Sequence, residues 1–185
     1  MKDEIKEALI APIRAFHLPR YAEIPDVGLY LEQTAKYING FLAPLSGMEI
    51  TTSMISNYVK QGLIANPVKK QYAAEQVAYL IFIAVSKTVL SMENIRLLID
   101  MQKPTYSSQV AYDYFCSELE NVVGYVFGMK DAIDSIGSTD TDEKVMLRNT
   151  IIAVAHKIYL DKCFEAIKAD FAQSERNNGE MRERE

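Results

Sequence analysis

The stretch that decides the fold runs from Thr51 to Tyr72 and reads TTSMISNYVKQGLIANPVKKQY. Thr51 is a residue type that caps helix N-termini, and Gly62 readily takes the left-handed conformation that ends a helix. The stretch therefore predicts a short helix over residues 52–61. Two aliphatic residues, a proline, a basic turn and a tyrosine follow it.

Helical spacing divides this short helix into an apolar and a polar face. Ile55, with Tyr58 or Val59, is expected to face inward. A polar helix face suits the major groove of DNA, and a basic turn suits a neighbouring phosphate. Asn57 is of a residue type that can read adenine. For Tyr58 and Tyr72, packing is the favoured role. The candidate DNA-binding residues are Thr51, Thr52, Ser53, Ser56, Asn57, Tyr58, Lys60, Lys69, Lys70 and Tyr72.

The remainder of the chain also favours helices, because glycine and proline are few and apolar residues recur at helical spacing. Ser91 and Thr141 are placed to cap two of these helices. The segment 107–136 is expected to form one long helix, or two joined near Gly124. The other expected helices cover residues 3–16, 29–42, 74–88, 92–101 and 142–173. The predicted class is all-α.

Landmarks along residues 58–98 carry a family resemblance. Tyr58, Gly62, Leu63-Ile64 and Pro67 form one group, Tyr72, Val77, Leu80 and Phe82-Ile83 a second, and Ser91, Ile95 and Leu97-Leu98 a third. In this order they resemble the recognition helix, wing and following helices of the MerR family of transcription regulators. With Leu18-Pro19-Arg20 and Ile24-Pro25-Asp26, the chain is also similar to an uncharacterised bacterial family, a domain of unknown function, that has a MerR-like head.

The resemblance implies a winged helix-turn-helix that binds double-stranded DNA as a homodimer. It divides the chain into an N-terminal helix and connector (1–28), the MerR-like head (29–103), a helical, bundle-like dimerisation or effector region (104–173) and a disordered tail (174–185). Two departures favour a different use of the same fold. Ser56 stands where classical members have a DNA-contacting Arg, and the wing between Pro67 and Tyr72 is short and has no glycine. The alternative is a non-enzymatic protein-interaction module built on a degenerate helix-turn-helix.

Charge is distributed unevenly along the chain, whose net charge is −5. Residues 51–90 hold four lysines and one acid, whereas residues 104–172 hold six bases and eleven acids. A phosphate backbone attracts the first segment and repels the second. The charge pattern therefore favours a local DNA contact through the head and excludes a polyanion-coating protein.

No pattern of residues in the sequence indicates a catalytic or metal-binding site. Cys116 and Cys163 have no metal-ligand spacing and are expected to be buried and inert. No nucleophile–base pair, phosphate loop or metal set is present, so the sequence predicts no enzyme, cofactor or metal. The acidic start and the short longest apolar run, residues 77–85, predict neither export nor a membrane span. The cytoplasm is the expected location.

Aromatic residues concentrate in the segment after the predicted head. Three interpretations stay open for them: an aromatic core, a dimer interface, or a pocket for a small apolar effector. The expected partners are therefore double-stranded DNA, a second copy of the chain and such an effector. The residues concerned are Tyr106, Tyr112, Tyr114, Phe115, Tyr125 and Phe127.

Overall fold

The computed structural model describes residues 3–137 and 141–182, and its architecture is all-α, as predicted. The helices surround one two-stranded antiparallel pairing. The elements are α1 (Asp3–Arg14), the 3-10 helix η1 (Tyr21–Glu23), β1 (Leu29–Tyr30), α2 (Leu31–Leu42), the 3-10 helix η2 (Ala43–Leu45), α3 (Thr52–Lys60), β2 (Gln71–Tyr72), α4 (Ala74–Ser86), α5 (Met92–Gln102), α6 (Ser108–Val126) and α7 (Asp142–Arg182).

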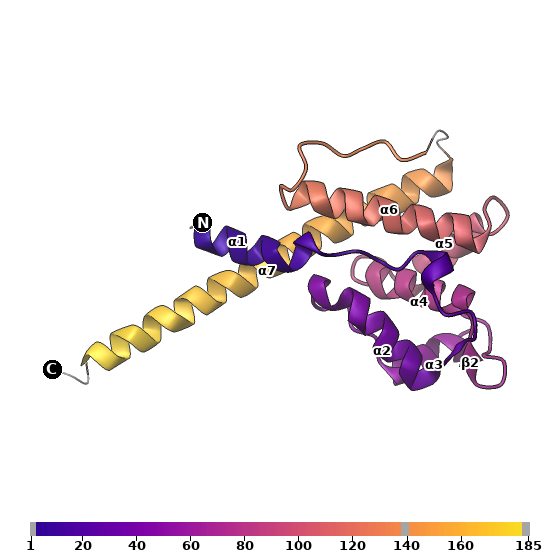
Figure 1. The fold of residues 1–185 in the computed structure, drawn as a ribbon, viewed down its shortest axis with the longest axis horizontal. Helices are drawn as coiled ribbons and strands as arrows, with labels where there is room; N and C mark the ends of the chain where they lie inside the picture. The colour runs from indigo at the N-terminus through magenta and orange to yellow at the C-terminus, as the bar shows by residue number, and fades with distance from the viewer. Residues whose placement is uncertain (1–2, 138–140, 183–185) are drawn as a thin grey trace.

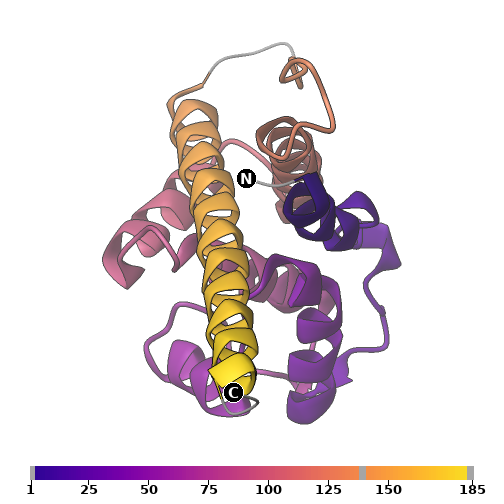
Figure 2. The same cartoon turned by 90° about the vertical axis from the view of Figure 1, so that its left-hand side faces the viewer.

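Helix α4 lies at the centre of the core. Its run from Val77 to Val85 is apolar on nearly every side, as expected of a helix enclosed by others. α2, α6, α7 and β2 all contact it. Figure 1 shows α6 on one side of α4, with α2, α3 and β2 on the other, and Figure 2 shows α7 crossing the molecule lengthwise. One hydrophobic core is therefore shared by the elements around α3 (α2 and β2) and by the later helices α6 and α7.

The local signals for helix ends are confirmed in α3 and α5. The Thr51 hydroxyl accepts the backbone N–H of Met54, and the Ser91 hydroxyl accepts that of Asn94. Gly62 has a φ of +66°, and the N–H of Leu63 reaches back to the carbonyl of Tyr58. Such a left-handed ending pairs carbonyls that a helix end would otherwise leave open.

Three elements differ most from the expected ranges, while other helix ends move by one or two residues. Leu29 and Tyr30 form β1 rather than the first turn of α2, because they pair with Tyr72 and Gln71. α6 ends at Val126, not near residue 136. Gly128, at a φ of +70°, stops it with the same left-handed ending as α3.

The third difference is at the C-terminus, where α7 continues to Arg182 through most of the tail expected to be disordered. Extending an existing helix costs less than starting one, which explains how a polar sequence continues it. In Figure 1 this part of α7 projects beyond the body of the molecule. Within the described ranges, no helix combines the length and apolar character needed to span a membrane.

Two acidic residues of α6, Glu118 and Glu120, pair with side chains from two different parts of the chain. Glu120 accepts hydrogen bonds from both terminal nitrogens of Arg20, at 2.7 and 2.6 Å, and one from the backbone N–H of Leu18. A paired, two-pronged contact of this kind fixes orientation as well as distance. It holds the connector between α1 and α2 against α6.

Glu118 points to the opposite side and is fully buried against α7. Arg148 Nε lies 2.9 Å from its Oε1, but in the described structure neither carboxylate oxygen accepts a well-directed hydrogen bond. Burial raises the pKa of Glu118, and Arg148 and Lys144 oppose that rise only in part. Glu118 is therefore easier to protonate in the folded chain than in the unfolded one.

We expect Glu118 to make stability depend on pH. An acid whose pKa is raised by folding contributes stability below its unfolded pKa, near 4.3, and that stability is lost as the pH rises through the folded pKa. The free energy of unfolding should therefore fall more steeply from pH 4 to 7 in the wild type than in Glu118→Gln. Urea unfolding at four pH values measures both slopes. Parallel slopes would contradict the assignment, whereas a constant offset would reflect only the lost partner of Arg148.

Candidate nucleic-acid interface

The polar side of α3 is exposed, and its apolar side is buried. Ile55 and Tyr58 face the core, which leaves Ser53, Asn57 and Lys60 exposed to solvent. Thr52 and Ser56 are half-buried between the two sides, and Thr51 is exposed, with its hydroxyl engaged in the cap. The helix therefore offers hydroxyl, amide and ammonium groups on one face, as the sequence predicts.

Two of the candidate DNA-binding residues do not belong to this face. Tyr58 is 5% exposed and Tyr72 4%, and both pack in the hydrophobic core. Burial raises the pKa of both phenols. Neither ring can reach a base edge in this structure, so their role as DNA contacts is corrected to packing. This is the role that the sequence favoured for them.

Side chains from distant positions hold α3 at both ends. Asn39 of α2 donates to the carbonyl of Ile50 at 3.0 Å and accepts its N–H at 2.8 Å. Arg96 of α5 donates to the carbonyls of Gln61 and Gly62, at 2.6 and 3.1 Å. A cation at the C-terminal end of a helix also interacts favourably with the helix dipole. These contacts fix the orientation of α3, and the sequence reasoning missed them.

The basic turn forms the tip of a tight hairpin. Val68 and Gln71 exchange backbone hydrogen bonds of 3.2 and 2.9 Å, which leaves Lys69 and Lys70 as the two loop residues. Their φ angles are +50° and +66°. Two positive φ values are typical of the mirror-image turn of two-residue hairpins, where Asn and Gly are preferred. The hairpin thus presents two lysines in a backbone conformation that lysine adopts only at a cost.

The hairpin is tied to the head at its base. Tyr72 pairs with Leu29 of β1, and Gln76 of α4 spans the hairpin's two arms. Its side chain accepts the N–H of Ala73 and donates to the carbonyl of Ala65, both at 2.8 Å. α2, α3 and β2 all lie on the side of α4 away from α6 (Figure 1). The loop of Lys69 and Lys70 therefore belongs to the same part of the molecule as the polar face of α3.

The three lysines of this surface are open to a negatively charged ligand. Lys60, Lys69 and Lys70 are all exposed, and within residues 7–137 and 141–172 none of them forms an ion pair. Elsewhere, Lys103, Lys130 and Lys157 are each paired with an acid on the same segment. Lys60, Lys69 and Lys70 differ from these lysines in having no acidic partner among the described residues. The name "lysine face" is used below for Lys60, Lys69, Lys70 and the exposed side of α3.

The chain matches the model of one protein family over part of its length. The family model described as "Domain of unknown function (DUF1836)" matches residues 19–115, just over half of the chain. The chain belongs to this family. The DUF1836 segment begins at the connector that Arg20 fastens to α6, and it includes α2 to α5 and part of α6. Comparisons with curated proteins and with solved structures found no match.

The DUF1836 segment is wider than the expected head, residues 29–103, and the structure offers a physical reason. The N–H of Tyr21 donates to Asp113, in the first half of α6, at 2.7 Å, whereas Glu120, the partner of Arg20, lies just beyond the matched residues. The connector and the first half of α6 thus pack as one unit with the head.

The two cysteines differ in burial, and neither belongs to a metal-ligand cluster in the described part of the chain. Cys116 is buried as expected, and burial raises the pKa of its thiol to about 12, so it stays protonated and unreactive. Cys163 is only half-buried, which corrects the expectation of full burial. In the described part of the chain, no three His, Cys, Asp or Glu side chains group as metal ligands would.

We expect relief of backbone strain at the hairpin tip to stabilise the protein while it weakens the lysine face. In the double variant Lys69→Asn, Lys70→Gly, each residue prefers the conformation it must adopt. The free energy of unfolding should rise by about 1–2 kcal/mol, which corresponds to a rise in Tm of roughly 2–8 °C for a chain of this size. Calorimetry measures the shift. Lys69→Ala, Lys70→Ala removes the same charges without relieving strain, so an equal rise in that control would contradict the strain argument.

Proposed function

We propose that this chain is a DNA-binding transcriptional regulator that acts as a homodimer, with α3 entering the major groove. The observation that carries the proposal is the lysine face: a polar helix face, fixed at both ends, and a hairpin tip of two exposed lysines in the same part of the molecule (Figure 1). Helix side chains read base edges, and lysines on a neighbouring turn contact phosphates. Lysine stands at two positions whose backbone conformation Asn or Gly would adopt at lower cost, which fits a role for its charge there.

Helix α7 supports the dimer in this proposal. Leu160, Phe164, Ile167 and Phe171 are all exposed and follow one another at intervals of four, three and four residues. This is the spacing of the apolar seam that joins two helices in a coiled coil. The stripe lies on the part of α7 that includes the projecting arm seen in Figure 1. Pairing of two such arms would cover apolar surface that a single chain leaves in water.

A dimer would present two copies of α3 to successive major grooves. Its half-sites should then lie about one helical turn of DNA apart, related by the twofold axis of the dimer. The acidic residues after position 104 would be kept away from the phosphates. The cytoplasm is the compartment in which such a regulator works.

A second candidate function is the protein-interaction module. Val27, Tyr30 and Val68 expose 75%, 53% and 73% of their surface, and all three lie at β1 or the hairpin. Tyr30 and Val68 both pair through the backbone with Gln71, so they are close together. Exposed apolar groups at this position would fit a protein partner better than a phosphate backbone.

Fluorescence anisotropy with random-sequence duplex DNA tests the proposal. Binding should have a dissociation constant of roughly 10⁻⁴–10⁻⁶ M near physiological salt and should weaken steeply as salt is added. Selection from a random duplex library then tests sequence specificity and half-site spacing. Absence of binding at low salt by a folded, dimeric protein would overturn the regulator and favour the protein-interaction module.

A further inference from the structure

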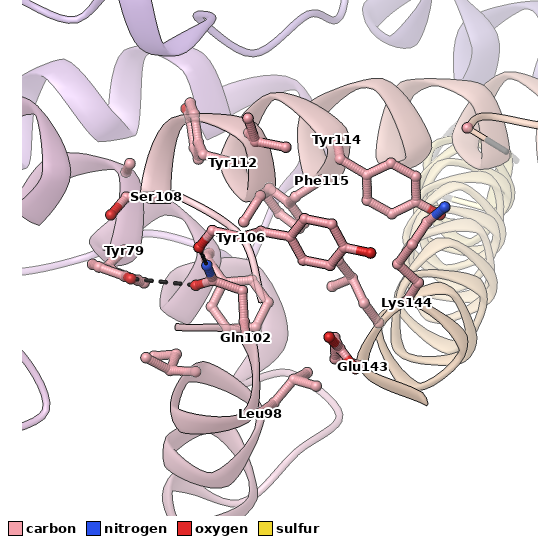
Figure 3. A pocket seen from close by; sticks show the side chains of 17 residues that line it. Tyr79, Leu98, Gln102, Tyr106, Ser108, Tyr112, Tyr114, Phe115, Glu143 and Lys144 are labelled. Carbon is pink, nitrogen blue, oxygen red and sulfur yellow. Dashed lines mark hydrogen bonds between the residues drawn. The ribbon is translucent and has the colours of Figure 1, made fainter. Parts of the chain in front are cut away.

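A cavity of about 300 Å³ lies between the head and the helices that follow it. α4, α5 and α6 form most of its wall, and the first turns of α7 close one side. Its size is at the lower end of the range for small-molecule sites, roughly 300–1,000 Å³. Figure 3 shows the Tyr106 ring projecting into this space between Gln102 on one side and Lys144 on the other.

Six of the seventeen residues that line the cavity are aromatic. Tyr79 and Phe82 come from α4, Tyr106 from the loop after α5, and Tyr114 and Phe115 from α6. Phe82 and Phe115 meet edge to face, with 5.4 Å between their ring centres. Aromatic rings prefer partners that are themselves flat and aromatic, in offset or edge-to-face contact. The wall therefore favours a planar, unsaturated ligand.

Several polar groups at the wall are already hydrogen-bonded within the protein, whereas the buried hydroxyl of Tyr112 has no hydrogen-bond partner in the described structure. Gln102 donates to the carbonyl of Tyr106 at 2.5 Å, and its carbonyl oxygen accepts the hydroxyl of Tyr79 at 3.3 Å. The hydroxyl of Ser108 donates to Glu75. A ligand with many hydroxyl or phosphate groups would lose its contacts with water and find few replacements here. This chemistry disfavours sugars and nucleotides as occupants.

Two side chains of opposite charge, Glu143 and Lys144, line the cavity. Glu143 and Lys144 are adjacent at the start of α7, and hydrogen bonds from threonine hydroxyls lower the pKa of Glu143, which keeps it ionised. The ammonium group of Lys144 lies 4.9 Å from the centre of the Tyr114 ring. Since one acid and one base stand together, the site offers no net charge to a ligand. A ligand with a charge of either sign would meet one like and one opposite charge, so the site favours neither sign and burial of the ligand's charge would be costly.

We propose that this cavity binds a small, uncharged aromatic molecule of one or two fused rings. The ligand would bridge two parts of the chain, because Tyr79 and Tyr114 belong to the DUF1836 segment and Lys144 lies beyond it. This binding site is independent of whether the lysine face binds DNA.

Isothermal titration of the full chain with 2-naphthol tests the site. We expect one molecule per chain, with a dissociation constant on the order of 100 µM for a ligand of this size. Naphthalene-2-sulfonate and 2-naphthylmethylammonium keep the ring and add a charge of either sign. Both should bind at least tenfold more weakly. Equal affinity for a charged analogue would overturn the inference of an uncharged ligand.

A cavity-filling variant locates the binding. Ala111 of α6 lines the cavity, and Ala111→Phe should weaken 2-naphthol binding at least tenfold. Ala153→Phe adds the same ring at an exposed position of α7 and should bind like the wild type. If Ala111→Phe does not fold, Val110→Trp at the exposed rim of the cavity replaces it, with the same expected loss. Unchanged affinity in a folded cavity variant, or no saturable binding by the wild type, would overturn the proposal.

Discussion

Replacement of Lys60, Lys69 and Lys70 by alanine is expected to reduce affinity for random-sequence duplex DNA by roughly 100-fold at moderate salt. Each lysine–phosphate contact releases counterions and contributes about 0.9 to the slope of log affinity against log salt. Loss of three contacts per chain should therefore lower that slope by about 2.7 for each chain of the dimer that contacts the DNA. The slope is the more diagnostic quantity, because partial unfolding would reduce binding without this specific change. Anisotropy titrations at four salt concentrations measure both.

A matched variant separates the lysine face from net charge. Lys103→Ala, Lys157→Ala, Lys168→Ala also removes three exposed lysines, all of them outside the lysine face. Lys103 and Lys157 form exposed ion pairs, whose loss costs little stability. This control should keep nearly all of its affinity. If both triple variants lose binding equally, long-range charge rather than the lysine face holds the DNA, and the placement of α3 in the groove is contradicted.

The second large effect is expected at α7. Phe164 and Phe171 are 57% and 67% exposed, and full burial of such a ring contributes up to about 1.5–3 kcal/mol. Phe164→Asp with Phe171→Asp removes four rings from a dimer and places like charges along its seam. The dissociation constant of the dimer should rise more than 100-fold. Light scattering after size exclusion should then report one chain, 20.9 kDa, in place of two.

Ala169→Asp is the control for α7, because position 169 faces away from the stripe and is exposed. It should stay dimeric. A wild type that is monomeric at tens of micromolar would contradict the dimer itself, whereas a double aspartate variant that stays dimeric would place the interface elsewhere. The aspartate variant should also lose affinity for a two-half-site operator more than for a single half-site.

Local signals in the sequence were sufficient to predict α3 and α5. Thr51, Gly62 and Ser91 act through hydrogen bonds to residues three to five positions away, so a reader of the sequence can identify both partners. Apolar residues at helical spacing likewise predicted the helix that became α4, and its burial is seen in the structure. These elements depend on interactions within one short segment.

The contacts that the sequence could not reveal join distant residues. Arg96 and the end of α3 are 34–35 residues apart, and Arg20 and Glu120 are 100 apart. Nothing near Arg96 distinguishes it from an ordinary surface arginine. The end of α6 was predictable in principle, since Gly128 is a typical helix stop. Asn121, whose side chain brackets Asp134, could not have been identified as the anchor of the following loop.

Helix α4 carries the hairpin's anchor and the cavity's wall within a few residues of each other. Gln76 spans the arms of the hairpin, Glu75 accepts the Ser108 hydroxyl of α6, and Tyr79 lines the cavity, all within about one turn of the same rigid rod. Because Gln76 and Tyr79 lie about one turn apart on the same helix, a rigid-body shift of α4 at the cavity would also move the residue that anchors the base of the hairpin.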